Sequence, residues 1–379
     1  MSGSSSEVNL KQTLRKLEYP LCAQEALKKI GELLCARVTN IKSMDLSLDL
    51  MAEFVFYEVD RRGNKRAQGL TPLVELQLLE ILYEFLNSIP NEASRNTLFL
   101  NLFSPSTVNS RVGILSKLVS LAIGIPSPLI LVSASTWMQQ LGNSSPASCK
   151  LAEALVFDYA QLAPNPEERL ISLPNIAPEF TSNLLTAVAE NYFVHKKEPM
   201  FPPQVLLKST TDWVTENSSL CVAAQLRQPH LPQGAIPMEA TTPIAGLLRW
   251  CVLAPIYDQN QDIYSKLYLA LLNSISEIPQ VQPPRAINVQ HLTAIIHPLY
   301  YYYEDLKHKG QTSGIIRDFH FQLALDRLAQ ALQIALSVNA VYGHLDELFN
   351  ALSNLHFNNL LTIVVNKYKQ SKGGPMILG

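Results

Sequence analysis

The chain has 379 residues, of which 47% are hydrophobic and only 16% are charged, and its formal net charge is -2. This length exceeds the size at which one compact hydrophobic core usually stops growing, so we expect two domains or an elongated repeat structure. The near-neutral charge gives no electrostatic footprint for nucleic acid, and the small charged fraction indicates a surface that partner proteins normally cover.

The first nineteen residues contain no apolar core before charged residues appear, so we expect no secretory signal peptide. The five cysteines include no close pair, which argues against a zinc site and indicates buried thiols in a reducing compartment. The uncharged run from Leu118 to Cys149 is the best membrane candidate, but Pro126 and Pro128 divide it. Neither half offers about twenty consecutive apolar residues, so we interpret it as two buried helices.

Helix signals run through almost the whole chain. Residues 73–86 are apolar nearly all round, so this helix must be covered on two or more sides. Ser-Pro or Thr-Pro pairs suit a helix N-cap followed by proline, and they stand at 71–72, 104–105, 127–128, 145–146 and 242–243. The predicted helices are residues 8–17, 21–37, 45–58, 72–88, 92–102, 108–124, 128–141, 146–161, 180–194, 204–225, 243–253, 262–276, 288–307, 315–337, 343–353 and 356–368.

Helix pairs of repeat size without a self-similar consensus predict an all-α fold of irregular HEAT-like or armadillo-like repeats, an α-solenoid. No strand with a hairpin turn is evident, although residues 48–57 also fit a strand. The proline-rich interval 199–243 is the natural place for a hinge. We therefore predict an N-terminal helical-repeat half at 1–198, a C-terminal half at 199–370 and a short flexible tail at 371–379.

No catalytic constellation interrupts these helices. The sequence contains no HExxH, Walker, GxGxxG or GxSxG motif, and its eight histidines never stand at the helical spacing of a metal site. We therefore predict no catalytic residues, no metal site and no cofactor. A helical enzyme with an unrecognised polar pocket stays open as an alternative.

Two local clusters have more than one interpretation. The four tyrosines 300–303 would spread around a helix, either bridging the core and water or contributing to an interface. The basic cluster Arg61, Arg62, Lys65 and Arg66 surrounds Gly63 and Asn64. It fits a solvated loop, and a nuclear import signal is the alternative.

Eight blocks, in this order along the chain, resemble the Integrator complex subunit 15 family. They are LVELQLLEIL (Leu73–Leu82), LFSP (Leu102–Pro105), LSKLVSLA (Leu115–Ala122), LAEALVFDY (Leu151–Tyr159), TPIAGLLRWCVLAP (Thr242–Pro255), YSKLYL (Tyr264–Leu269), LDRLAQALQIA (Leu325–Ala335) and NNLL (Asn358–Leu361). Longer family members also carry a proline-rich C-terminal extension and a lysine-rich insertion near Tyr257–Asp262, so contacts made by those segments are not expected here.

The resemblance implies a non-catalytic, nuclear, all-helical scaffold in the arm module of Integrator. Its expected partners are Integrator subunits 10, 13 and 14, with indirect association with RNA polymerase II. Small nuclear RNA 3'-end processing and transcription attenuation are the implied processes, and no direct nucleic acid or membrane contact is expected. The alternative is a helical-repeat adaptor that binds nucleic acid or other nuclear proteins outside Integrator.

Polar residues inside the matching blocks are the first candidates for partner binding. These are Arg249, Trp250, Lys266, Asp326, Arg327, Asn358 and Asn359. Each has a structural alternative: Trp250 as core, the pair 326–327 as ties to neighbouring helices, and the pair 358–359 as caps of the final helix.

Overall fold

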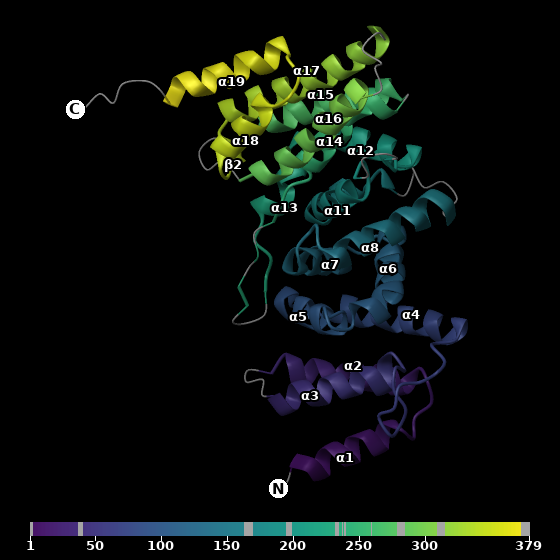
Figure 1. The fold of residues 1–379 in the computed structure, drawn as a ribbon. Coiled ribbons are helices and arrows are strands. Elements are labelled where there is room, and N and C mark those ends of the chain that lie inside the picture. Colours follow the sequence, from purple (N-terminus) through teal and green to yellow (C-terminus); the bar gives the residue numbers. More distant parts are fainter. Residues whose placement is uncertain are drawn as a thin grey trace, which may run out of the picture. The chain divides into compact units, whose positions relative to one another are not determined.

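The computed structural model describes residues 3–36, 41–162, 170–194, 199–231, 235–236, 238, 240–258, 260–278, 285–308 and 315–372 (Figure 1). The chain divides into two compact units. Unit 1 is Met1–Leu141 with Pro229–Met238, and unit 2 is Gly142–Gln228 with Glu239–Gly379. The halves predicted to meet at residues 198 and 199 stay a prediction, and residues 373–379 of the predicted tail lie outside the described residues.

Unit 1 is built of helices that pack on their neighbours in the chain. Its elements are α1 (Gly3–Leu14), α2 (Leu21–Leu34), α3 (Ile41–Leu50), the π-helix η1 (Met51–Val55), α4 (Pro72–Ser88), α5 (Glu92–Leu102), α6 (Val108–Gly124) and α7 (Pro128–Leu141). Helices α2 and α3 lie side by side (Figure 1). Helix α4 contacts α2, α6 and α7, which confirms that this apolar helix is covered on more than one side.

Helix α4 begins where the sequence predicts. The Thr71 hydroxyl accepts a hydrogen bond from the Val74 amide at 3.4 Å, and Pro72 occupies the first turn. Ser145 does the same for the Ser148 amide at 3.2 Å. In both cases an otherwise unpaired amide of the first helical turn gains an acceptor.

The other three Ser-Pro or Thr-Pro pairs do not cap a helix with their side chains. Helix α6 begins at Val108, three residues after Pro105. The Ser127 hydroxyl bonds the side chain of Asn87, and the Thr242 hydroxyl bonds the Ala286 carbonyl. Tertiary contacts therefore take the hydroxyls of Ser127 and Thr242, whereas the Ser104 hydroxyl bonds the nearby hydroxyls of Ser106 and Thr107.

The segment with an open strand alternative is helical. Helix α3 runs directly into η1, so residues 48–55 form no strand. The helix ends at Val55, three residues earlier than predicted, and Tyr57 just beyond it adopts a left-handed conformation with φ of +52°. The chain then leaves the helix and forms the loop that contains the basic cluster.

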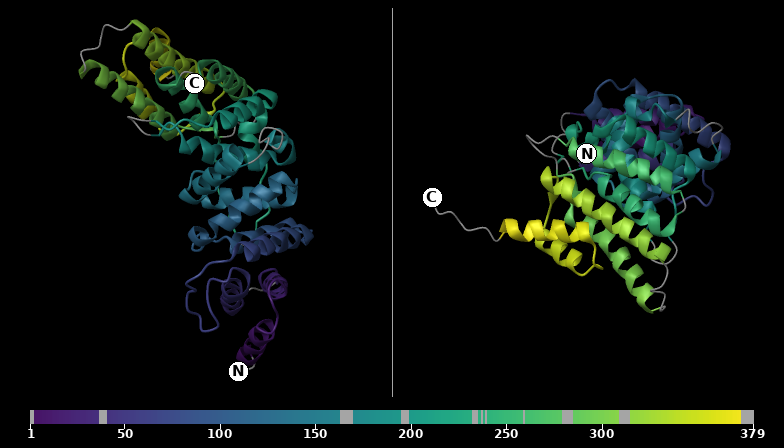
Figure 2. Two further views of the ribbon diagram at one scale, coloured as in Figure 1. Left: turned by 90° about the vertical axis from the view of Figure 1, so that its right-hand side faces the viewer. Right: turned by 90° about the horizontal axis from the view of Figure 1, so that it is seen from above.

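Unit 2 contains the remaining elements. They are α8 (Pro146–Phe157), the π-helix η2 (Asp158–Leu162), α10 (Leu173–Ile176), α11 (Pro178–Asn191), α12 (Gln204–Glu216), the 3-10 helix η3 (Ser218–Val222), α13 (Ala223–Leu226), α14 (Ile244–Tyr257), α15 (Gln261–Ser276), β1 (Ile287–Asn288), α16 (Val289–His308), α17 (Ile315–Ser337), β2 (Val341–Tyr342), α18 (Leu345–Ser353) and α19 (Asn359–Lys372). Helices α17 and α19 pack side by side (Figure 2).

Helix α14 is the centre of unit 2. Every residue from Ile244 to Pro255 is buried, and the helix contacts α11, α15, α16 and α17. It continues through Pro255 to Tyr257, four residues beyond its predicted end. A helix buried to this extent gains enough packing free energy to tolerate the loss of the backbone hydrogen bond that proline cannot make.

One further helix prediction for unit 2 is corrected, and the unit also contains one short pair of strands. The single helix predicted at 204–225 breaks at Asn217, whose side chain accepts a hydrogen bond from the Ser219 amide and starts η3. Asparagine side chains offer the backbone this alternative to a continuous helix. The two-residue strands β1 and β2 pair in parallel, with Ile287 opposite Val341. They are too short for any alternating pattern to show.

The predicted all-α helical-repeat fold is confirmed. Each unit consists almost wholly of helices that bury one or more faces against neighbouring helices. The proline-divided run at 118–149 forms α6, α7 and the start of α8. Over the described ranges, every helix is too short or too polar to cross a bilayer.

Candidate interaction sites

Arg249 and Trp250 tie α14 to the end of α11. The fully buried Trp250 donates its indole N–H to the Ala189 carbonyl at 3.2 Å. Arg249 donates to the same carbonyl at 2.6 Å and to the Tyr192 carbonyl at 3.4 Å, and it pairs with Glu190 at 3.4 Å. Both side chains therefore satisfy carbonyl groups at the C-terminus of α11.

A glycine lets the two helices approach closely at this point. A Cβ atom built on Gly246 would lie 2.6 Å from the Cβ of Ala189, which is closer than real side chains come. Gly246 stands one turn before Arg249 on α14. The close approach brings the guanidinium and the indole within reach of the α11 carbonyls.

Arg327 joins α17 to two other helices. Its guanidinium donates to the Cys251 carbonyl of α14 at 2.6 Å and to the Ser265 hydroxyl of α15 at 2.8 Å. It also lies over the ring of Tyr268 at 5.4 Å. Burial lowers the pKa of Arg327 and raises that of the neighbouring Cys251 thiol to about 12. The thiol is thus held neutral beside a buried cation.

Asn358 and Asp326 are brought together at the start of α19. The Asn358 amide nitrogen donates to Asp326 at 2.7 Å and to the Gln322 side chain at 2.9 Å. Its carbonyl oxygen accepts from the Leu361 amide at 2.9 Å, which makes Asn358 the N-cap of α19. This one buried amide fixes both the start of α19 and its position on α17.

The seven candidate residues thus fall into two groups. Trp250, Asp326, Arg327 and Asn358 have partners inside unit 2 that match their structural alternatives, and Arg249 also has its partners inside unit 2. Lys266 on α15 and Asn359 on α19 are exposed. Contact between any of the seven and another protein stays a prediction.

The tyrosine cluster divides between core and surface. Tyr303 stacks on His356 at 4.5 Å and on Phe321 at 5.8 Å, and Tyr302 contacts Phe321 and Tyr257. Tyr300 and Tyr301 are exposed. Adjacent positions on α16 therefore face different surroundings, as the helical period requires.

Sequence reasoning missed a cavity of about 380 Å³ in unit 1. Its lining comprises Phe56, Tyr57, Glu58, Lys65, Arg66, Gln68, Gly69, Leu70, Glu75, Ser110, Arg111, Gly113, Ile114 and Lys117. We call this site the loop cavity, because half of its lining comes from the loop at 57–70. The basic cluster was the only sequence signal that pointed to it.

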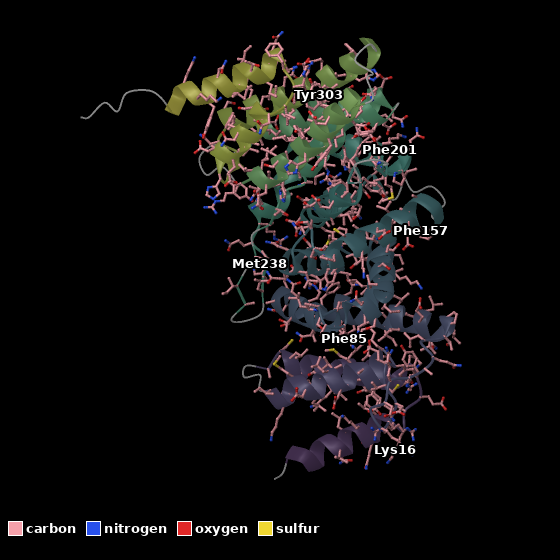
Figure 3. The ribbon with its side chains drawn as sticks, viewed as in Figure 1. Lys16, Phe85, Phe157, Phe201, Met238 and Tyr303 are labelled. Carbon is pink, nitrogen blue, oxygen red and sulfur yellow. The ribbon has the colours of Figure 1, made fainter. Side chains whose placement is uncertain are left out.

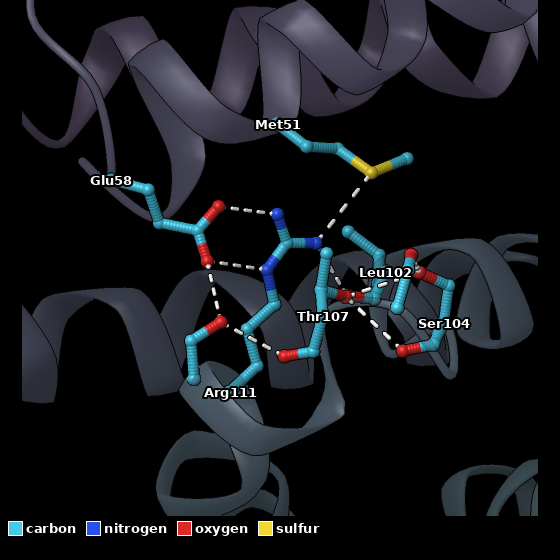
Figure 4. Close-up of polar contacts among 8 residues, drawn as sticks. Met51, Glu58, Leu102, Ser104, Thr107 and Arg111 are labelled. Atoms are coloured by element: carbon cyan, nitrogen blue, oxygen red, sulfur yellow. Dashed lines mark hydrogen bonds and ion pairs between the residues drawn. The ribbon is translucent and has the colours of Figure 1, made fainter. Parts of the chain in front are cut away.

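Arg111 lines the loop cavity, and Figure 4 shows its polar contacts. This almost fully buried guanidinium binds both carboxylate oxygens of Glu58, at 2.8 and 2.6 Å, and donates to the Leu102 carbonyl at 2.7 Å. It also covers the ring of Phe56 at 4.0 Å. The bidentate ion pair with Glu58 joins α6 to the loop, and the bond to Leu102 joins α6 to the end of α5.

The basic loop is folded into a turn. The Asp60 carboxylate accepts hydrogen bonds from the amides of Arg62 and Asn64, and Gly63 has φ of +80°. Arg66 donates to the Val59 carbonyl at 2.9 Å and lies over the Tyr57 ring at 4.4 Å. Burial raises the pKa of Tyr57 to about 12, so this contact is between a cation and a neutral ring.

Apolar side chains are exposed on both units. In unit 1, Ile41, Met44 and Leu48 share one face of α3. In unit 2, Phe157 and Phe201 are exposed (Figure 3), as are Phe357 and Ile363 at α19. Side chains of this size on one helical face are typical of surfaces that other proteins cover. No group of three metal-binding side chains occurs in the described part of the chain.

Comparison with known proteins gives one consistent result. The sequence profile described as Integrator complex subunit 15 matches residues 8–356. The chain is 35% identical to Integrator complex subunit 15 of Drosophila melanogaster over 98% of its own length and 100% of that protein. It is 31% identical to the Danio rerio protein of the same name and 29% identical to the Homo sapiens one.

The two vertebrate alignments cover 84% of this chain, and 71% and 77% of the fish and human proteins. The profile match includes every candidate residue except Asn358 and Asn359, which follow its end at residue 356. The profile matches almost the whole chain, and one relative is more than 30% identical to it. This is stronger evidence of family membership than the eight separate sequence blocks. The chain therefore belongs to the Integrator complex subunit 15 family.

Proposed function

We propose that this protein is a non-catalytic scaffold subunit of the Integrator complex. The observation that carries the proposal is the alignment with the whole of the Drosophila subunit 15. Exposed apolar side chains on α3 and α19 supply surfaces that other helical proteins could cover. The family's name states assembly into Integrator, and the family's profile matches residues 8–356 of this chain.

Within Integrator, we infer the arm module as its place, with subunits 10, 13 and 14 as its direct partners. The protein would then act in the nucleus, where it would support small nuclear RNA 3'-end processing and attenuation of transcription by RNA polymerase II. The two exposed candidates, Lys266 and Asn359, are the first positions at which to look for partner contacts.

Quantitative mass spectrometry of proteins that co-purify with the tagged endogenous chain from nuclear extract tests the proposal. We expect Integrator subunits to be enriched over an unrelated tagged nuclear protein, and subunits 10, 13 and 14 to resist salt best. Recovery of other Integrator subunits without these three would contradict the arm assignment alone.

If the intact chain recovers no Integrator subunit, the scaffold function is wrong. An adaptor for nucleic acid or for other nuclear proteins then becomes the better explanation. A gel-shift assay separates these outcomes, because a nucleic-acid adaptor must retard RNA or DNA in a salt-dependent way.

A further inference from the structure

We propose that the loop cavity of unit 1 binds an acidic peptide segment of a partner protein and receives one apolar side chain of that segment. The inference names a partner chemistry for the scaffold role and rests on that role in requiring a protein partner. It goes beyond the seven candidate residues, none of which lines this cavity.

The cavity has the size and the wall of a side-chain pocket. Its volume of about 380 Å³ falls within the range of roughly 300–1,000 Å³ in which proteins hold small ligands. Phe56 and Ile114 contribute buried apolar surface to the lining, and Leu70 adds a half-buried side chain. An apolar side chain placed there would leave water and contact these apolar side chains.

The charges around the cavity favour an anionic occupant. Two of the four lining cations are neutralised by lining carboxylates, because Arg111 pairs with Glu58 and Lys117 pairs with Glu75. Among the described residues, neither Lys65 nor Arg66 forms an ion pair with a carboxylate, although the charge of Arg66 helps to lower the pKa of Asp60 in the neighbouring turn. The lining therefore carries a net excess of two positive charges, counting four cations against two carboxylates.

The turn extends this positive charge beyond the cavity. Arg61 and Arg62 are exposed at its tip, and no carboxylate within the described residues forms an ion pair with either of them or with Lys65. Asp60, the turn's own carboxylate, accepts hydrogen bonds from the turn's amides. Three exposed cations beside an apolar pocket match a peptide with carboxylates next to an apolar residue.

The folded turn argues against reading the cluster as a linear import signal. Arg66 is held by the Val59 carbonyl and the Tyr57 ring, and Val59 pairs with Lys65 across the turn. Because Glu58 and Glu75 already pair with Arg111 and Lys117, only two lining cations are left to meet an anion. A short acidic peptide can match so few cations, whereas each nucleotide of a nucleic acid brings another phosphate.

Fluorescence anisotropy with the purified full chain tests the proposal. The probe is a fluorescein-labelled peptide in which aspartate and glutamate flank one phenylalanine. Comparison peptides carry serine in place of phenylalanine, or lysine in place of the acidic residues. We expect the acidic phenylalanine peptide to bind best, its affinity to fall with salt, and the lysine peptide not to bind.

Matched variants locate the binding. The triple variant Arg61→Ser, Arg62→Ser and Lys65→Ser should lose about tenfold in affinity, since each exposed cation contributes a modest term. The control triple variant Lys16→Ser, Lys42→Ser and Lys367→Ser removes the same charge from exposed lysines outside the cavity and should bind like the parent chain. Leu70→Ser should abolish the preference for phenylalanine over serine.

Several results would overturn the inference. These are no binding of the acidic peptide at low salt, equal losses in the two triple variants, or no preference for phenylalanine in the parent chain. An RNA oligonucleotide that binds more tightly than the peptide, and loses affinity in the loop variant, would also overturn it. Because peptide binding is measured without Integrator, its failure is distinguishable from failure of the co-purification.

Discussion

Arg111 is a buried cation that joins α6 to the loop at Glu58 and to the end of α5. Replacing it by alanine removes the guanidinium from the Leu102 carbonyl and leaves the Glu58 carboxylate with only the Ser110 hydroxyl as a side-chain donor. We expect Arg111→Ala to lower the free energy of unfolding by about 3 kcal/mol, near the lower end for a broken buried pair, because Glu58 is partly exposed. Urea unfolding measures this value. Lys117→Ala, in a more exposed pair, should cost less than about 1 kcal/mol.

Two helical glycines should respond to alanine in opposite directions. Gly246→Ala places a methyl group against Ala189 and should destabilise unit 2 by about 1–3 kcal/mol, because α14 and α11 must separate. Gly113→Ala on α6 meets no atom within 4 Å and should stabilise unit 1 by about 0.5–1 kcal/mol. Thermal unfolding of both variants tests the pair, and equal shifts would contradict the close approach.

His291 on α16 should make unit 2 less stable in mild acid. Burial lowers the pKa of His291 below 6.5; Glu190 opposes the shift and Arg249 adds to it. The unfolded chain therefore binds this proton at a higher pH than the folded chain does, so stability falls as the pH drops below about 6.5. His291→Gln should flatten the loss between about pH 7 and pH 5. The exposed His344→Gln serves as the control, and an unchanged slope in His291→Gln would refute the assignment.

The Asn358 side chain caps α19 and ties its start to α17. Asn358→Ala removes the acceptor of the Leu361 amide and the donor to Asp326 and Gln322. We expect a loss of about 1–2 kcal/mol and faster hydrogen exchange across residues 359–372, with little change in α14. Asn359→Ala, at the adjacent exposed position, should leave exchange unchanged. Equal exchange in the two variants would show that the cap does not hold α19.

The exposed apolar faces of α3 and α19 should govern how the chain behaves alone. Without partners, these faces remain in water, and we expect the purified chain to self-associate as its concentration rises. Light scattering coupled to size-exclusion chromatography measures this, with Met44→Lys and Ile363→Lys as variants that should reduce it. A monodisperse parent chain at high concentration would show that these faces need no cover.

Local physical chemistry predicted most of the helices from the sequence. Thr71 and Ser145 mark helix starts because their hydroxyls cap the first turn without help from distant residues. The apolar character of α4 correctly predicts a helix covered on more than one side. The same local rules fail at Asn217, where a side chain competes with the helix, and at Pro255, where packing overrides it.

The sequence by itself determined the all-α class, the positions of most helices and the family, because short-range periodicity and collinear blocks carry that information. Only the tertiary structure decided the roles of individual polar residues. Arg327 and Asn358 bond groups that lie 76 and 32 residues away along the chain, and no local pattern encodes such partners. Long-range contacts also form the loop cavity, because Arg111 pairs with Glu58, which lies 53 residues away along the chain.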